Sequence, residues 1–324
     1  MSIMENVKGA IISSNYNKAD FWEDTIKSAL MQETPFPLVL ILSDNGSTDR
    51  SVSIVETYSQ QYPDKVIGYH TPVNLGIAGN YYRCIKYALS LGVTHFLLLD
   101  SDDYLCHQDY FAKQVEFLLS HPDYSFSYSN IHEIGAEQKL SKDPELKRIP
   151  NYLFSDSGIT TRRIITNGGP YSSGSVVYAS NKMNCFFEEF ATDEVVKQFV
   201  IQDMPLQLYC SRSGKIAKCN VDAVGIRVLP GSESRSMDIE KIERVANGCL
   251  FARRRFIHLY ENDDPELLKK ADCLNEMKML RRIAKNQPNQ YLPRLRSVLR
   301  KYPNLIMKKA VLQSMLVYLR NVWK

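Results

Sequence analysis

Four short apolar runs alternate with helical patterns in the first hundred residues, and this alternation limits the folds that are open to the chain. The apolar runs cover residues 9–13, 38–43, 66–70 and 95–100, and the helical patterns cover residues 20–31, 50–62 and 79–91. The runs lack polar alternation, which is typical of strands that are buried on both faces of a parallel sheet. The order therefore predicts an α/β fold in which helices flank a sheet.

Two acidic turns follow the second and the fourth predicted strands. They read SDNGSTD (43–49) and DSDD (100–103). Open parallel sheets bind ligands beyond the carboxyl ends of their strands, so both turns should face one crevice. In the first turn, Asn45 and Gly46 allow a positive φ, and the residues that follow can cap the next helix. Taken alone, this turn is equally well explained as a plain strand-to-helix connection.

The DSDD turn places Asp100, Asp102 and Asp103 directly after three leucines. Carboxylates at this spacing repel one another unless a cation, or donors such as sugar hydroxyls, offset the repulsion. Carboxylate oxygens suit Mg²⁺ or Mn²⁺, which usually also bind phosphate groups of a substrate. The turn predicts a metal-bound, phosphate-bearing ligand, and the alternative is a solvated acidic turn.

Several segments in order resemble the inverting nucleotide-sugar glycosyltransferases of family 2. In the first half they are IISSNYN (11–17), DNGSTD (44–49), NLGIAGNYYRCI (74–85) and LLLDSDD (97–103). Residues 168–182 resemble the acceptor-side strand of that family, and residues 201–234 resemble its catalytic-base helix, following strand and closing loop. The resemblance covers about residues 7–236.

The resemblance implies a GT-A fold, with a Rossmann-like nucleotide-binding mixed sheet flanked by helices. We expect a catalytic domain over residues 1–237, with a donor half to about 135 and an acceptor and base half over about 136–237. Residues 238–324 would then form a helical extension with a basic amphipathic tail.

The resemblance also assigns roles to the acidic residues of both turns. Asp44 would contact the nucleoside of the donor, Asp100 would touch the ribose and order the metal shell, and Asp102 would bind Mn²⁺ or Mg²⁺ directly. Asp103 has two open roles, because it could orient the sugar or cap the helix that begins near Tyr110.

The remaining expected donor contacts are Asn17, Asn74, Arg83, Arg227 and Arg235. The two arginines of the closing loop, Arg227 and Arg235, would meet the diphosphate, although surface arginines on a loop are the alternative. The family commonly has a histidine where this chain has Leu229, which implies weaker metal binding.

Asp203 takes the position of the general base in the family. Inverting transfer is a single displacement, so one carboxylate must remove the proton of the acceptor hydroxyl. A cation would stabilise the departing diphosphate. Asp203 could also be the N-cap of a helix that contains Pro205, and Asp193 and Glu194 are the reserve candidates for the base.

The C-terminal region has its own electrostatic character. Residues 281–324 contain eleven basic residues and no acidic ones. Helical patterns cover 238–260 and 264–285, and apolar residues recur at helical spacing over 292–302 and 312–323. A basic amphipathic helix can lie in an anionic membrane interface, and the alternatives are an interface between copies of the chain and ordinary helical packing with a solvated basic face. We recognise no nucleic-acid-binding module, so we expect no nucleic-acid partner.

No stretch reaches the roughly 18–20 apolar residues that span a bilayer, and the amino terminus lacks a signal pattern. We expect a cytoplasmic protein, peripheral on the inner face of the plasma membrane.

The expected activity is metal-dependent, inverting transfer from a nucleotide diphosphate sugar, with UDP favoured, to a saccharide acceptor. A lipid-linked acceptor in capsule, O-antigen or exopolysaccharide synthesis is favoured. One alternative is a non-catalytic sugar-nucleotide or glycan-binding subunit. Another is a nucleotidyltransferase, which would need a glycine-rich, lysine-bearing loop that residues 13–20 do not provide.

Overall fold

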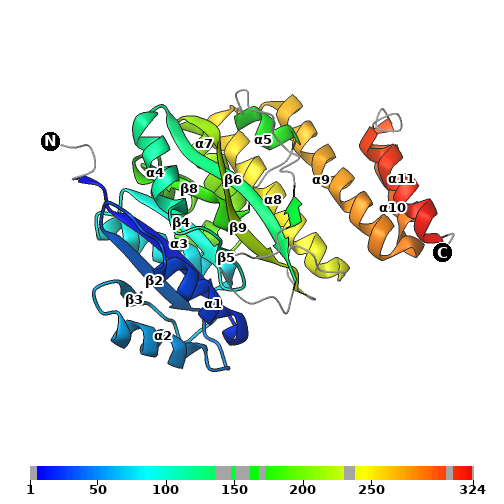
Figure 1. Cartoon of the computed structure of the whole chain (residues 1–324). Helices are drawn as coiled ribbons and strands as arrows, with labels where there is room; N and C mark the ends of the chain where they lie inside the picture. The colour runs from blue at the N-terminus through cyan, green and yellow to red at the C-terminus, as the bar shows by residue number, and fades with distance from the viewer. Residues whose placement is uncertain are drawn as a thin grey trace. The chain divides into compact units, whose positions relative to one another are not determined.

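The computed structural model describes residues 6–135, 147–149, 161–167, 172–229, 238–303 and 309–322. Its strands are β1 (Gly9–Asn15), β2 (Leu38–Asp44), β3 (Val66–Gly68), β4 (His95–Asp100), β5 (Tyr104–Leu105), β6 (Tyr124–Ile134), β7 (Lys147–Ile149), β8 (Val176–Ala179) and β9 (Lys215–Arg227). They form one sheet in the order β3-β2-β1-β4-β8-β6-β9-β5, with β7 paired to β6 (Figure 1). The sheet is mixed, because β1 is parallel to β2 and β4 whereas β8 is antiparallel to β4.

The longer helices of the first part of the chain are α1 (Ala19–Leu30), α2 (Ser51–Gln61), α3 (Gly76–Ser90), α4 (Tyr110–Ser120) and α7 (Asp203–Arg212). Short helices are α5 (Thr161–Asn167) and α6 (Asp193–Val196), and the C-terminal helices are α8 (Ile239–Tyr260), α9 (Pro265–Asn286), α10 (Pro288–Lys301) and α11 (Lys309–Val322). The α/β fold class, with a mixed sheet, flanking helices and a C-terminal helical region, is confirmed.

The core explains why the strands lack polar alternation. Leu97 and Leu99 of β4 belong to one large cluster, which also contains Trp22 of α1 and Phe111 of α4. Successive side chains of a strand point to opposite faces, so Phe96 lies on the other face, where its ring stacks 5.1 Å from that of Tyr178. Both faces of β4 are therefore apolar.

The chain divides into two compact units. The first contains Met1–Thr161 and Gly169–Leu229, and the second contains Arg162–Gly168 and Pro230–Lys324. The sheet lies in the first unit. We expected a catalytic domain that ends at residue 237 and an extension that begins at residue 238. This division by function stays a prediction.

Two helices of the second unit, α8 and α9, begin at aspartates that cap them. Asp238 accepts a hydrogen bond from the Glu240 N–H at the start of α8, and Asp264 accepts from the Glu266 N–H at the start of α9, both at 2.9 Å. Satisfying these otherwise unpaired N–H groups fixes where each helix begins. In the described part of the chain, none of the helices combines the length and the apolar content that a membrane crossing requires.

Candidate active site

The parallel strands β1, β2 and β4 end at the same edge of the sheet. Asn15 of β1 is in register with Asp44 of β2, and Ser14 of β1 is in register with Asp100 of β4. Neighbouring strands lie about 4.8 Å apart, so the two acidic turns flank a single strand end. The predicted meeting of the turns at one edge is observed.

The carboxylate of Asp44 shapes the first turn. It is completely buried, and its Oδ2 accepts hydrogen bonds from the Gly46 N–H at 3.1 Å and the Ser47 N–H at 2.9 Å. Gly46 has a φ of +76°, and a Cβ there would lie 2.8 Å from the backbone of Val73, so the turn requires glycine. Contact of Asp44 with a nucleoside stays a prediction.

Asparagine side chains join the loops around this turn. Asn17 accepts a hydrogen bond from the Thr48 N–H at 2.8 Å, and Asn45 accepts one from the Leu75 N–H at 2.9 Å. Asn45 also donates to the side-chain oxygen of Asn74 at 3.2 Å. The expected donor contacts Asn17 and Asn74 thus lie at the turn, where both hold loop backbone in place.

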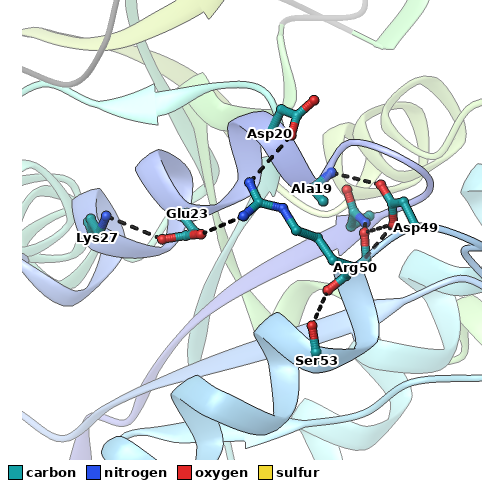
Figure 2. Close-up of polar contacts among 9 residues, drawn as sticks. Ala19, Asp20, Glu23, Lys27, Asp49, Arg50 and Ser53 are labelled. Carbon is teal, nitrogen blue, oxygen red and sulfur yellow. Dashed lines mark hydrogen bonds and ion pairs between the residues drawn. The ribbon is translucent and has the colours of Figure 1, made fainter.

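The starts of α1 and α2 are fixed to each other by Asp49. Its carboxylate accepts from the Ala19 N–H and from the Ser51 N–H, each at 3.0 Å (Figure 2). Burial opposes ionisation, but the hydrogen bonds from Ser51 and Ala19 outweigh it and lower the pKa of Asp49. Next to it, Arg50 pairs with Asp20 at 3.3 Å and with Glu23 at 3.7 Å. The N-cap of α2 is Arg50, so the expectation that a residue of the turn caps this helix is wrong by one position, although Asp49 does bind the first N–H of the helix.

The three carboxylates of the DSDD turn each meet a protein donor. Lys18 Nζ lies 2.7 Å from Asp102 Oδ2, and the Tyr81 hydroxyl donates to Asp100 Oδ1 at 2.7 Å. The backbone N–H of Arg227 donates to Asp103 Oδ1 at 3.0 Å. These partners offset part of the repulsion within the turn.

The electrostatics of the turn follow from its burial. Burial and the charge of Asp102 raise the pKa of Asp100 and of Asp103. Burial alone would lower the pKa of Lys18, but the charge of Asp102 and the hydrogen bond to it raise that pKa. The ion pair between Lys18 and Asp102 is the charged pair at the centre of the turn.

Arg227 lies behind the turn. Its Nε donates to the Asp102 carbonyl oxygen at 3.1 Å, its Nη2 lies 3.5 Å from Asp24, and its guanidinium lies 5.0 Å from the ring centre of Phe21. The side chain is only 2% exposed, so it faces the protein interior in this conformation. Contact of Arg227 with a diphosphate stays a prediction, and Arg235 lies outside the described residues.

Asp103 does not cap α4, so that expectation is wrong. The N-cap of α4 is Asp109. The reason is that Tyr104 and Leu105 form β5, which pairs with β9 and brings Asp103 against Arg227. A role of Asp103 toward the sugar stays a prediction.

Asp203 is the first residue of α7, whereas the N-cap is Gln202. The N-cap alternative for Asp203 is therefore wrong by one position. The Met204 N–H donates to Asp203 Oδ1 at 2.8 Å, and the carboxylate is partly exposed. The partial positive charge at a helix N-terminus stabilises the ionised form of a carboxylate there.

Two consecutive tyrosines of α3 contact the DSDD turn and the start of α7. Tyr81 donates to Asp100, and Tyr82 donates to the Gln202 carbonyl oxygen at 2.9 Å, directly before Asp203. Burial, followed by the charge of Asp203, raises the pKa of Tyr82. One helix thus positions the DSDD turn and the start of α7.

Arg83 lines a separate hollow near the end of β2. Its Nη2 donates to Ser43 Oγ at 2.9 Å and to the Tyr69 carbonyl oxygen at 2.6 Å, and its guanidinium lies 4.0 Å from the Tyr69 ring centre. The hollow has a volume of about 340 Å³ and is lined by Tyr69, Gly79, Tyr82, Arg83, Lys86, Tyr87, Asp193 and Val196. Asp193, a reserve candidate for the base, is exposed and pairs with Lys86 at 2.7 Å.

The described residues do not form a metal site. They contain no group of three His, Cys, Asp or Glu side chains placed to hold an ion. Of the expected ligands, Asp102 faces Lys18 and Asp100 accepts from Tyr81. Both predicted ligands of Mn²⁺ or Mg²⁺ thus already have partners within the protein, and metal binding by them stays a prediction.

Four residues of the site were missed from the sequence: Lys18, Tyr81, Tyr82 and Gln202. Tyr81 and Tyr82 lie within residues 74–85, a segment that resembles the family, but no spacing indicates which tyrosine contacts which part of the site. Lys18 directly follows Asn17, which the resemblance places at the donor site, and this neighbour is the signal that could have identified it.

Comparison with families of known proteins finds one family model, described as glycosyl transferase family 2, that matches residues 10–175. Uncharacterized protein Rv1520 of Mycobacterium tuberculosis is 28% identical over 168 residues, which cover 48% of this chain and 47% of that protein. Uncharacterized protein Mb1547 of Mycobacterium bovis matches to the same extent. The chain thus spans about half the length of the curated relatives that it matches.

Solved structures resemble the chain over most of its length. Residues 1–349 of S. aureus TarS, solved in complex with UDP-GlcNAc, share 15% identity and a TM-score of 0.53, covering 92% of each chain. GalNAc-T7, solved with UDP, GalNAc and Mn²⁺, shares 11% identity and a TM-score of 0.53 over 83% of this chain and 54% of that one. At these identities the likeness shows the fold, which is GT-A-like as predicted.

Proposed function

Because the chain belongs to glycosyl transferase family 2, we propose that it transfers a sugar from a nucleotide diphosphate donor to a saccharide acceptor with inversion. The observation that supports this proposal best is the placement of both acidic turns at one strand edge, in register across β1. Through Tyr81 and Tyr82, α3 contacts both the DSDD turn and the start of α7. A binding crevice and a candidate base are thus held by the same helix.

In the proposed reaction, an acceptor hydroxyl oxygen attacks the anomeric carbon while the bond from that carbon to the diphosphate oxygen breaks. Asp203 takes the hydroxyl proton, and the nucleoside diphosphate leaves with the bonding electron pair. A partly exposed carboxylate at the start of α7 suits this role, because an acceptor can reach it and the helix N-terminus favours its charge.

The donor is proposed to be a UDP-sugar. TarS was solved with UDP-GlcNAc and GalNAc-T7 with UDP, and both share the fold of this chain. The metal dependence predicted from the sequence has weaker support: GalNAc-T7 was solved with Mn²⁺, but the described residues here do not form a ligand set. We therefore derive no step through a metal ion.

Calorimetric titration with UDP, GDP, CDP and dTDP, each with Mn²⁺ and again with a chelator, tests the donor class. We expect UDP to bind and the other three to bind at least about tenfold more weakly, a difference of about 1.4 kcal/mol. Binding of none of the four would contradict the proposed function. Binding of UDP without any release of UDP from UDP-sugars would favour the non-catalytic sugar-nucleotide-binding alternative.

The proposed acceptor is lipid-linked, at the cytoplasmic face of the plasma membrane, as in synthesis of a surface polysaccharide. The support is an exposed apolar row on α11, which consists of Leu312, Met315, Leu316, Leu319 and Val322, all between 38% and 57% exposed. The preceding helix α10 carries four basic residues, Arg294, Arg296, Arg300 and Lys301. Apolar and basic side chains together suit an anionic bilayer interface.

Leu316→Glu should weaken binding to anionic vesicles by at least about tenfold, because it places a negative charge in the centre of the apolar row. Co-sedimentation with vesicles of phosphatidylglycerol measures this binding. Gln313→Glu is the matched control, since it adds the same charge to an exposed position of α11 outside the row. Unchanged vesicle binding in Leu316→Glu, together with loss of a dimer in light scattering, would instead identify the row as an interface between two copies of the chain.

A further inference from the structure

The ammonium group of Lys18 lies at the position where a cation would meet the DSDD turn. Its Nζ is 2.7 Å from Asp102 Oδ2, and the Asp102 side chain is only 8% exposed. The carboxylate is shielded from water, whereas Lys18 is 36% exposed, so solvent screens part of the attraction between the two charges. Asp102, the residue expected to bind a metal directly, thus has a cation from the protein itself.

The other two carboxylates of the turn are also supplied with donors. Asp100 accepts from the Tyr81 hydroxyl, and Asp103 accepts from the Arg227 N–H. A divalent ion at Asp102 would compete with the Lys18 ammonium, because two cations beside one carboxylate repel each other. The arrangement therefore disfavours a metal at the turn.

The backbone on both sides of Lys18 is held in place. Asn17 is joined to the first acidic turn by its contact with the Thr48 N–H, and the Ala19 N–H donates to Asp49. Figure 2 shows Asp49 reaching Ala19 at the start of α1. Thr48 and Asp49 of the DNGSTD segment thus hold the backbone on both sides of Lys18.

Lys18 also keeps one side open toward solvent. Its side chain is 36% exposed although it contacts a buried carboxylate. An ammonium has three donors, and the contact with Asp102 uses one direction only. The remaining donors can meet an anion that enters the crevice, and a diphosphate is the anionic group of the proposed donor.

We infer that Lys18 is the built-in cation of this site, which neutralises Asp102 in place of a divalent ion and presents its ammonium to the diphosphate of the donor. Nucleotide binding then does not require a metal. The identity of the anion in this inference rests on the proposed function. The competition between Lys18 and a metal ion for Asp102 does not depend on that function.

Titration of the nucleotide-free full chain with Mn²⁺ alone, followed by the electron paramagnetic resonance signal of free Mn²⁺, tests the competition. Lys18→Met removes the charge and keeps the length of the side chain. We expect this variant to bind Mn²⁺ at least about tenfold more tightly than the unmodified protein, because Asp102 loses its internal cation. Equal Mn²⁺ affinities in the two proteins would overturn the inference.

Three further variants control for charge and for folding. Lys27→Met removes a lysine of α1 that is exposed and pairs with Glu23 at 3.4 Å, and it should leave Mn²⁺ binding unchanged (Figure 2). Lys18→Arg retains a cation and should behave like the unmodified protein. If Lys18→Met fails to fold, Lys18→Gln provides the same test with a polar side chain.

Calorimetry with UDP separates this inference from the proposed function. The UDP affinity of the unmodified protein in Mn²⁺ and its affinity in chelator should differ by no more than about threefold, which is below about 1 kcal/mol. Lys18→Met in chelator should bind UDP at least about tenfold more weakly. Dependence of the unmodified protein on Mn²⁺ would overturn the inference while supporting the function. Failure of every protein to bind UDP would count against the function, and the Mn²⁺ titration would still decide whether Lys18 excludes a metal.

Discussion

Asp203→Asn should lower turnover by roughly 10²–10⁴-fold while nucleotide binding changes by no more than about threefold. The substitution keeps the size of the side chain and an oxygen that can accept from the Met204 N–H, the contact now made at 2.8 Å. It removes the ability to accept a proton from the acceptor. Only the transition state needs that proton transfer, so the loss should appear in kcat.

The surroundings of Asp203 should survive this change. The segment before it is held by Gln202, which accepts from the Tyr82 hydroxyl at 2.9 Å and donates to Ser173 Oγ at 2.7 Å. Because neither contact uses the Asp203 carboxylate, α7 should begin at the same residue in the variant. A fall in activity would then report chemistry and not a displaced helix.

The measurement is the rate of UDP release from the UDP-sugar donor, with nucleotide affinity determined separately by calorimetry. Asp193→Asn is the matched control, because Asp193 is 88% exposed, pairs with Lys86 and borders the hollow that contains Tyr82. We expect it to change turnover by less than about threefold. If Asp193→Asn abolished turnover and Asp203→Asn did not, the base would be Asp193, and the assignment of Asp203 would be wrong.

The strands and their acidic turns could be predicted because each is encoded by residues that are consecutive in the sequence. An apolar run followed by Asp and Gly or by several Asp residues predicts a strand end, and parallel order predicts a shared edge. The predicted end of β1 was two residues short, since Ser14 and Asn15 are polar. Asn15 is nevertheless buried, because its amide donates to Ser51 Oγ at 2.6 Å.

The partners of the carboxylates could not be predicted in the same way. Lys18 and Asp102 are 84 positions apart in the sequence, and Arg227 and Asp103 are 124 apart. No local periodicity indicates which loop meets which strand end. The side-chain burial of Arg227 also depends on β5 and β9, and β5 is a two-residue strand that no apolar run predicts. A sequence resemblance assigns a residue to a motif, but it does not tell whether the side chain faces the crevice or the core.

Arg227→Met should lower the free energy of unfolding of the first unit by roughly 3 kcal/mol. The guanidinium donates to the Asp102 carbonyl oxygen at 3.1 Å and lies 3.5 Å from Asp24. A methionine of similar length fills much of the space against Phe21, but it leaves the carbonyl oxygen and Asp24 without these partners. The loss should therefore come from polar groups and not from a cavity.

Urea unfolding followed by the fluorescence of Trp22 measures this effect, because Trp22 is completely buried in the core of the first unit. The chain has two tryptophans, so a Trp323→Phe background makes Trp22 the sole reporter. Arg212→Met is the control, since Arg212 is an exposed arginine of α7, and it should change the free energy by less than about 1 kcal/mol.

The same variant decides between two roles of Arg227. Arg227 positions the DSDD turn if its 2% exposure reflects its role. In that case Arg227→Met is less stable, and it binds UDP more weakly under conditions that partly unfold the protein. At low temperature, where the variant is folded, UDP binding should weaken only by as much as the turn shifts. If Arg227 meets the diphosphate directly, as the sequence predicts, stability should be unchanged and UDP affinity should fall by about tenfold or more, since a charge-assisted contact contributes about 1.5–3 kcal/mol. A large loss of stability is the outcome that the buried position requires.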